Sequence, residues 1–265
     1  MPYSQRDPHP PITITPLTMT ERADDYPYQA PQASYVISHG CYRLIQKQEM
    51  PDLSGRVAVL SVGSNRSPQQ LLRKFGSDAY LPVTRARLHD CDIIHSACFS
   101  YYGAVPCSAF PSQGTSIMLN AVWLTAEQLQ IMHDTEAVGI AYDYCRWDDG
   151  IVEILDAPQP DSIYGYATRL GFLQDDMARP YALSSLRADN RQFTSLSQQD
   201  GRLALYQALP ADLQHGDITS FMTALVGDKA FRLTVNERLA EIAAPIPSGP
   251  WQIVPATPKD ANSFL

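Results

Sequence analysis

The chain lacks the features that would direct it to a membrane or to a nucleic acid. Its 265 residues contain no apolar run near the roughly 18–20 residues that a membrane span needs. No hydrophobic stretch follows Met1, so we expect no secretory signal. Lys and Arg total 20 against 28 Asp and Glu and form no cluster, which argues against binding to a phosphate backbone. We expect a cytoplasmic protein that binds neither membranes nor nucleic acids.

Paired cysteines are also lacking. The chain has five cysteines: Cys41, Cys91, Cys98, Cys107 and Cys145. Their odd number and the lack of a Cys-x-x-Cys pair argue against a disulfide framework and against a structural zinc site. The run His89–Asp92, with His95 and Cys98 nearby, has the residue types of a metal site. On a strand these side chains would alternate between two faces, so we expect no metal there. The chain has no Gly-x-Ser-x-Gly elbow, no P-loop and no Gly-x-Gly-x-x-Gly motif.

Proline is concentrated at the two ends of the chain. Seven of the 21 prolines fall within residues 1–31, which predicts a poorly packed segment that lacks regular structure over most of its length. Residues 33–50 contain two short apolar stretches that fit either a strand or a helix. We therefore divide the chain into an extended arm (1–50), a main domain (51–204) and a helical extension (205–265), whose last residues are again rich in proline and extended.

A strand, a tight turn and a helix open the main domain. Val57–Val62 is an almost continuous apolar run, as expected for a strand covered on both faces. After Gly63-Ser64-Asn65, the sequence Ser67-Pro68-Gln69-Gln70 fits a capping box with proline at the first helical position. Gly76 can end this helix.

The rest of the main domain mixes strands and helices. We expect strands at 87–94, 116–123, 151–155 and 162–170, and a helix from the capping box at Thr125 to about Thr135. A further helix is predicted from Pro180. In the extension, helices are predicted at 217–226 and 235–243, the second with its capping box at Thr234. This mixture predicts an α/β (α+β) fold.

Two places in the main domain could carry chemistry. Gly63-Ser64-Asn65 precedes a helix N-terminus, where unpaired N–H groups and the positive end of the helix dipole favour an anion. An ordinary capped turn explains the same residues. Glu136 lies four residues after Met132, so a continuing helix would put its carboxylate on the apolar face, where burial suits a general base. If the helix ends at Thr135, Glu136 can instead turn outward.

The order of these motifs resembles the γ-glutamylcyclotransferase superfamily over residues 56–190. Val62-Gly63-Ser64-Asn65 is similar to the family's Tyr-Gly-Ser-Asn motif, and Met132–Ala137 is similar to the segment that carries its catalytic Glu. Cys107–Gly114 and Arg179-Pro180-Tyr181 resemble two further family segments. Three positions depart from the pattern: Val62 replaces Tyr, Asn120 stands where Gly is usual, and Ala137 replaces Gly. The loss of the tyrosine at Val62 leaves the substrate undetermined.

The resemblance implies a fold with a small mixed β-sheet or barrel and packed helices. It also implies a reaction that needs neither a metal nor a cofactor. The α-amine of a γ-glutamyl compound would attack its own γ-carbonyl, form 5-oxoproline and release an amine, with Glu136 as the acid and base. The α-carboxylate would bind to backbone N–H groups around Gly63–Arg66. The residues implied for substrate binding are Val62, Gly63, Ser64, Asn65, Arg66, Tyr142, Tyr144 and Tyr181, although the three tyrosines are equally compatible with core or rim positions.

Three hypotheses for function follow. The first is a lactam-forming cyclotransferase acting on a γ-glutamyl amide, peptide or amine. The second is a cyclotransferase-like domain that has lost catalysis and serves as a binding or scaffold module. The third is a biosynthetic enzyme that removes a γ-glutamyl group from a larger product. The partners considered are a small γ-glutamyl compound and, in a homodimer, a second copy of the chain.

Overall fold

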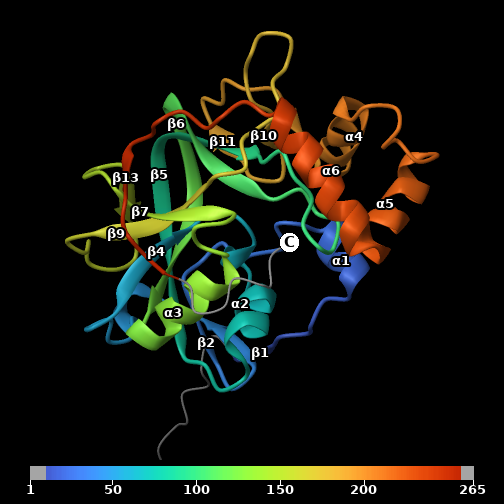
Figure 1. Cartoon of the computed structure of the whole chain (residues 1–265). Coiled ribbons are helices and arrows are strands. Elements are labelled where there is room, and N and C mark those ends of the chain that lie inside the picture. The colour runs from blue at the N-terminus through green and yellow to red at the C-terminus, as the bar shows by residue number, and fades with distance from the viewer. Residues whose placement is uncertain (1–9, 258–265) are drawn as a thin grey trace, which may run out of the picture.

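The computed structural model describes residues 10–257, apart from the side chains of Thr20 and Lys47. A long mixed sheet forms the centre, and helices cover it (Figure 1). The central pair is the antiparallel hairpin of β5 (Leu81–His95) and β6 (Cys107–Leu124), whose register shifts between His89 and Cys91. The fold class α+β is therefore confirmed.

Shorter strands extend the sheet on both sides of this hairpin. On the β6 side follow β4 (Val57–Ser61), β9 (Ile163–Thr168), β7 (Tyr142–Trp147) and β13 (Trp251–Ile253). On the β5 side follow β2 (Tyr35–Ser38), β3 (Cys41–Leu44) and β1 (Ile12–Thr13). Small strands pair with the hairpin or with one another: β8 (Val152–Ile154), β10 (Ala182–Leu183), β11 (Ala188–Asp189) and β12 (Ser195–Leu196).

The strand β4 shows why the sheet has a core on each face. Its side chains alternate: Ala58 and Leu60 belong to one hydrophobic cluster, while Val59 belongs to another. The second cluster includes Leu71 from α2 (Pro68–Phe75) and Met132 from α3 (Ala126–Thr135), so these two helices cover one face of the sheet. Burial on both faces explains the nearly continuous apolar run of this strand.

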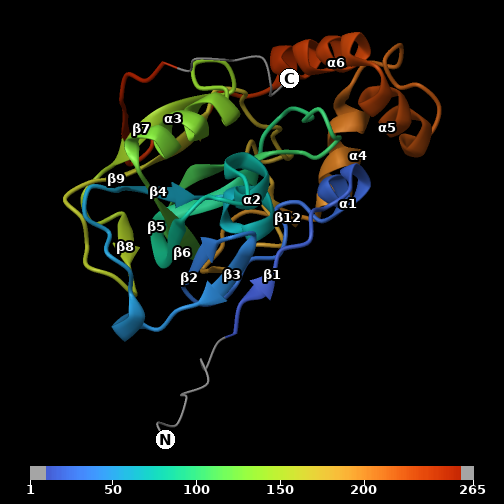
Figure 2. The ribbon, with the colours of Figure 1, turned by 90° about the horizontal axis from the view of Figure 1, so that it is seen from below.

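A separate group of helices packs beyond the end of the hairpin. It comprises α4 (Gln198–Ala208), α5 (Ile218–Gly227) and α6 (Lys229–Ile242), and α1 (Met19–Asp24) lies near them (Figures 1 and 2). Phe99 and Val105, from the β5–β6 connection, share a hydrophobic cluster with Phe221 and Leu239. Within residues 10–257, no helix has the length and apolar composition needed to cross a membrane.

Most predicted elements are present, including all the strands expected between 57 and 170. The capping box at Thr125 forms in full, and Gly76 ends α2 with φ of 79°. The capping box at Ser67 does not form, because the Ser67 hydroxyl donates instead to the Gln69 side chain at 2.6 Å. α6 begins at Lys229 and not near Thr234, because Asp228 caps the N–H groups of Ala230 and Phe231.

One further prediction is wrong, and another is wrong in part. Pro180 starts no helix: Ala182 pairs with Ile94 of β5, because the free edge of the long hairpin offers backbone partners. In residues 10–31, the part of the proline-rich segment that the structure describes, most residues lack regular structure as predicted, but the segment is not poorly packed throughout. Thr18 forms a capping box for α1, and Tyr26 and Tyr28 are buried in the main core. Proline content therefore did not prevent the aromatic side chains that follow α1 from packing.

Candidate functional site

The turn after β4 is shaped by close packing at Gly63. A Cβ on Gly63 would lie 2.7 Å from the Tyr26 hydroxyl and 2.9 Å from the Cys107 sulfur. These distances are shorter than real contacts, so any side chain at this position would force the Tyr26 hydroxyl or the Cys107 sulfur to shift. The chain then enters a 3₁₀ turn, Ser64–Arg66, in which Arg66 N donates to Gly63 O and Ser67 N donates to Ser64 O. These bonds do not use the N–H groups of Ser64 and Asn65.

Glu136 combines parts of both interpretations offered by the sequence. The helix α3 ends at Thr135 and Glu136 is its C-cap, yet the side chain turns inward and is only 13% exposed. Its Oε1 accepts a hydrogen bond of 2.9 Å from the Asn65 side-chain amide and is paired with the Lys74 ammonium. The next residue, Ala137, has φ of 47°, which redirects the chain after the helix. The carboxylate is therefore fixed from two other elements of the fold.

Lys74 is the buried partner of Glu136. It lies on α2, three residues after Leu71, and its side chain is 1% exposed. Burial lowers the pKa of the Lys74 ammonium, while the Glu136 carboxylate raises it. The interaction joins α2 to the end of α3, so the acidic group is held between two helices that cover the same face of the sheet.

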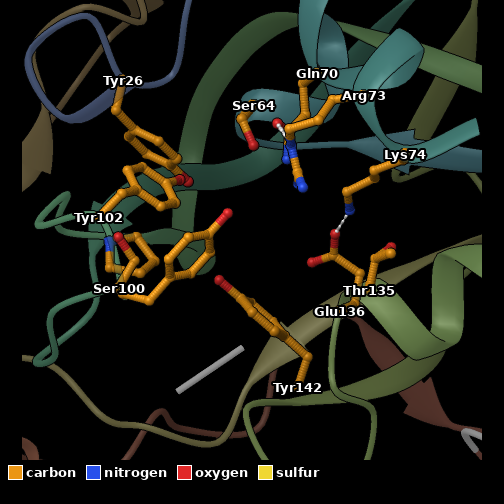
Figure 3. Close-up of a pocket in the computed structure, with 12 residues that line it drawn as sticks. Tyr26, Ser64, Gln70, Arg73, Lys74, Ser100, Tyr102, Thr135, Glu136 and Tyr142 are labelled. Atoms are coloured by element: carbon orange, nitrogen blue, oxygen red, sulfur yellow. Dashed lines mark hydrogen bonds and ion pairs between the residues drawn. The ribbon is translucent and has the colours of Figure 1, made fainter. Parts of the chain in front are cut away.

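The Glu136 carboxylate borders a cavity of about 120 Å³ that Ser64 also lines. In Figure 3, Lys74 and Glu136 stand on one side of this cavity, Tyr26 and Tyr102 stand on the other, and Tyr142 reaches in from below. The carboxylate oxygen that does not contact Lys74 points into the open space (Figure 3). We call this space the Glu136 cavity.

The tyrosines of the Glu136 cavity are held in their neutral form. Burial raises the pKa of Tyr26, Tyr102 and Tyr142 well above the usual value, so their hydroxyls keep their protons. The Tyr26 hydroxyl accepts from Cys107 N at 3.2 Å, and the Tyr142 hydroxyl donates to Cys107 O at 3.4 Å. Neutral hydroxyl groups opposite a carboxylate can orient a polar substrate or stabilise an oxygen that gains negative charge.

The structure brings together only part of the residue set implied by the resemblance. Ser64, Glu136 and Tyr142 line the cavity, and Asn65 contacts Glu136 directly. Val62 is buried directly before Gly63, and its carbonyl accepts from the Cys107 thiol at 3.6 Å.

Three of the implied residues lie elsewhere. Arg66 is buried and donates from Nε to Asn120 at 3.2 Å, so its side chain supports the turn and does not line the cavity. Tyr144 stacks on Tyr164 with ring centroids 5.1 Å apart, on the side of the sheet covered by α3. Tyr181 borders a different, small hollow that also contains His95. Tyr142 and Tyr144 lie two positions apart on β7 and belong to the same hydrophobic cluster, but Tyr144 packs further along the strand, against Tyr164.

Several residues of the Glu136 cavity were missed by the sequence analysis. Lys74 had a signal, because a lysine three residues after a buried leucine occupies the inner stripe of a helix. Gln70, four residues before Lys74, lies on the same stripe and also lines the cavity. Tyr26 and Tyr102 had no such signal, because they come from the N-terminal segment and from the β5–β6 connection.

The cluster of metal-ligating residue types is dispersed by the fold. Asp92 is fully buried and paired with Arg191 at 2.8 Å, whereas His89 lies at the surface near Glu153. Among residues 10–257, no group of three or more His, Cys, Asp and Glu side chains could hold a metal ion.

Comparisons of the chain with family models, with curated proteins and with solved structures give no match in any of the three.

Proposed function

We propose that the protein is a γ-glutamylcyclotransferase-like enzyme, which converts a γ-glutamyl amide, peptide or amine into 5-oxoproline and a free amine. The observation that carries this proposal is the shared cavity: the Glu136 carboxylate and the turn at Ser64 border one space, although 71 residues separate Asn65 from Glu136. A γ-glutamyl group has its carboxylate, amine and γ-carbonyl within a few bonds. The reaction therefore needs an anion site and a base in the same cavity.

The backbone turn supplies a site for the substrate's α-carboxylate. Ser64 N and Asn65 N are not used in the hydrogen bonds that close the 3₁₀ turn, and they lie just before the N-terminus of α2. Both the free N–H groups and the helix dipole favour a negative charge there. With the carboxylate bound at this turn, the α-amine would lie toward the cavity, where the Glu136 carboxylate can take its proton.

Glu136 would transfer protons in both halves of the reaction. It takes one proton from the α-ammonium group, and the neutral amine attacks the γ-carbonyl carbon to form a five-membered ring. The ring nitrogen then loses a second proton, the bond from the γ-carbon to the leaving nitrogen breaks, and that nitrogen leaves as an ammonium ion with both protons. Positioning the two reacting groups could contribute up to about 7–11 kcal/mol, and the base roughly 10²–10⁴-fold.

A second candidate is a binding module without catalysis, and the contact of Lys74 with Glu136 favours it. An ammonium group paired with the carboxylate competes for the oxygen that a base must offer. The enzyme is the better-supported candidate because Asn65 and Lys74 both contact Oε1, which leaves the other oxygen toward the cavity.

The test is to incubate the protein with a panel of γ-glutamyl amides, dipeptides and amines and to measure 5-oxoproline by mass spectrometry. We expect release of 5-oxoproline and the amine in equal amounts from at least one compound, and none from the matching α-glutamyl compounds. Glutamate in place of 5-oxoproline would indicate a hydrolase and contradict the proposal. Binding of γ-glutamyl compounds without turnover would support the binding module.

A further inference from the structure

The helix α2 presents two successive cations to the Glu136 cavity, and one of them has no carboxylate partner. Lys74 is buried and paired with Glu136. Arg73, the residue before it, is exposed, and its guanidinium points into the cavity between Ser64 and Lys74 (Figure 3). Within residues 10–257, no carboxylate lies within ion-pair distance of Arg73. Because the side chain is exposed and borders the cavity, its guanidinium can contact a molecule that enters.

The described residues that line the cavity carry more positive than negative charge. Glu136 is the one carboxylate among them, whereas Arg73 and Lys74 are both cations. The two cations influence each other: burial lowers the pKa of the Lys74 ammonium most, the Glu136 carboxylate opposes this, and the Arg73 guanidinium lowers it further. One carboxylate does not neutralise both cations, so the cavity favours a ligand that brings an anionic group.

A buried side chain holds Arg73 in its orientation. Gln70, three residues earlier on the same face of α2, is 6% exposed and also lines the cavity. Its Oε1 accepts a hydrogen bond of 3.0 Å from Arg73 Nε. This bond uses Nε and leaves the Nη1 and Nη2 groups for the two parallel hydrogen bonds that arginine makes with a carboxylate.

We propose that Arg73 binds the α-carboxylate of the substrate and makes the Glu136 cavity selective for a free α-amino acid head group. The α-carboxylate and the α-amine share one carbon, so their partners on the protein must lie close together. Arg73 directly precedes the lysine that is paired with Glu136. The carboxylate then lies between Arg73 and the turn at Ser64, and the amine faces the Glu136 oxygen that points into the cavity. The identity of the head group rests on the proposed function, to which Arg73 adds a side-chain partner for the carboxylate.

The test compares γ-L-glutamylanilide with 4-aminobutyranilide, which lacks the α-carboxylate and is otherwise the same compound. The leaving amine is uncharged in both, and kcat/KM is measured from the release of aniline. We expect the unmodified chain to prefer γ-L-glutamylanilide at least about tenfold. Arg73→Met should lower kcat/KM for this compound about ten- to hundredfold, mainly through KM. For 4-aminobutyranilide it should change kcat/KM less than about threefold, because no carboxylate is there to bind.

Two further variants serve as controls. Arg73→Lys keeps the charge but not the fork of donors, and it should retain part of the preference for γ-L-glutamylanilide. Arg238→Met, at an exposed arginine of α6 that does not line the cavity, should behave as the unmodified chain does. Thermal unfolding shows whether each variant is folded, and the comparison of the two anilides on the unmodified chain needs no variant.

The role of Arg73 and the reaction can fail separately. If neither anilide is turned over, their dissociation constants are measured by calorimetry with the unmodified chain and Arg73→Met. The same preference in these constants, with no 5-oxoproline from the whole panel, would support Arg73 and contradict the reaction. The inference is overturned if the unmodified chain does not distinguish the two anilides, or if γ-L-glutamylanilide neither binds nor reacts. It is also overturned if Arg73→Met leaves both compounds unaffected or weakens both equally.

Discussion

The side-chain amide of Asn65 donates a hydrogen bond of 2.9 Å to the carboxylate of Glu136, across 71 residues of sequence. The two residues belong to different elements: Asn65 lies in the turn after β4, and Glu136 ends α3. The bond connects the two segments on which the resemblance to γ-glutamylcyclotransferases rests. It also holds one carboxylate oxygen of Glu136 in place. The second oxygen is thereby oriented, as a base must be to take a proton from a bound group.

Removing the proton acceptor should abolish the proposed reaction. We expect Glu136→Gln to reduce 5-oxoproline formation at least about 10²–10⁴-fold, because glutamine keeps the size of the side chain but cannot take the proton. The measurement is 5-oxoproline release from the best substrate of the panel. Glu127→Gln, an exposed change in the first turn of the same helix, is the control and should retain full activity. A rate for Glu136→Gln within a few-fold of the unmodified chain would remove Glu136 from the mechanism.

The ion pair between Lys74 and Glu136 should contribute to stability as a unit. Lys74→Met leaves the carboxylate without its partner in a largely buried place, and we expect it to lower the free energy of unfolding by about 3 kcal/mol. The double variant Lys74→Met/Glu136→Gln should recover most of this loss, because no uncompensated charge then remains. Urea unfolding of the two single variants and the double variant measures the coupling.

The control for this cycle is Lys229→Met, an exposed lysine at the start of α6, which should change stability by less than about 0.5 kcal/mol. Simple addition of the two single effects in the double variant would show that the pair is not coupled.

The close packing at Gly63 predicts a specific rescue. Gly63→Ala would push a methyl group against the Tyr26 hydroxyl and the Cys107 sulfur, and should cost about 1–3 kcal/mol. Adding Tyr26→Phe removes the hydroxyl oxygen and should restore part of the loss. Gly227→Ala, where a methyl group would meet nothing within 4 Å, is the control and should not destabilise the protein. Thermal unfolding decides the outcome, and an unrescued double variant would show that the Tyr26 hydroxyl is not the obstacle.

His95 should make stability fall in acid. Burial lowers the pKa of His95 to about 4 from 6.5, although the Leu196 carbonyl, which accepts from Nε2 at 3.1 Å, opposes the shift. Between these two values the unfolded chain binds the proton more readily than the folded one. The contribution of His95 to the free energy of unfolding is therefore fully present above about pH 6.5. As the pH falls from there to about 4, the free energy of unfolding decreases by about 3 kcal/mol.

The measurement compares unfolding free energies of the unmodified chain and of His95→Gln between pH 7 and 4. The variant keeps a donor for the Leu196 carbonyl but does not titrate, so its stability should fall by about 3 kcal/mol less over this range. Equal slopes for the two proteins would contradict the assignment.

Local sequence signals determined the elements that carry the candidate site. The apolar run at Val57–Val62 predicted β4, and the capping box at Thr125 predicted the start of α3, because both depend on residues within a few positions of one another. The same reasoning placed Gly63, Ser64 and Asn65 in a turn before a helix. It failed at Pro180, where pairing with the β5 edge replaced the expected helix, and it missed the packing of Tyr26 and Tyr28, which are buried within the proline-rich segment.

Only the tertiary structure decided what surrounds Glu136. The sequence allowed the carboxylate to face either the core or the solvent, and the choice depends on Asn65 and Lys74, which are 71 and 62 residues away. The assembly of Tyr26, Tyr102 and Tyr142 into one cavity wall, and the exclusion of Tyr144 and Tyr181, depend in the same way on how strands and connections pack. Periodicity specifies which face of an element is apolar, but the partner of a buried polar group is set by segments distant in the chain, which no local pattern encodes.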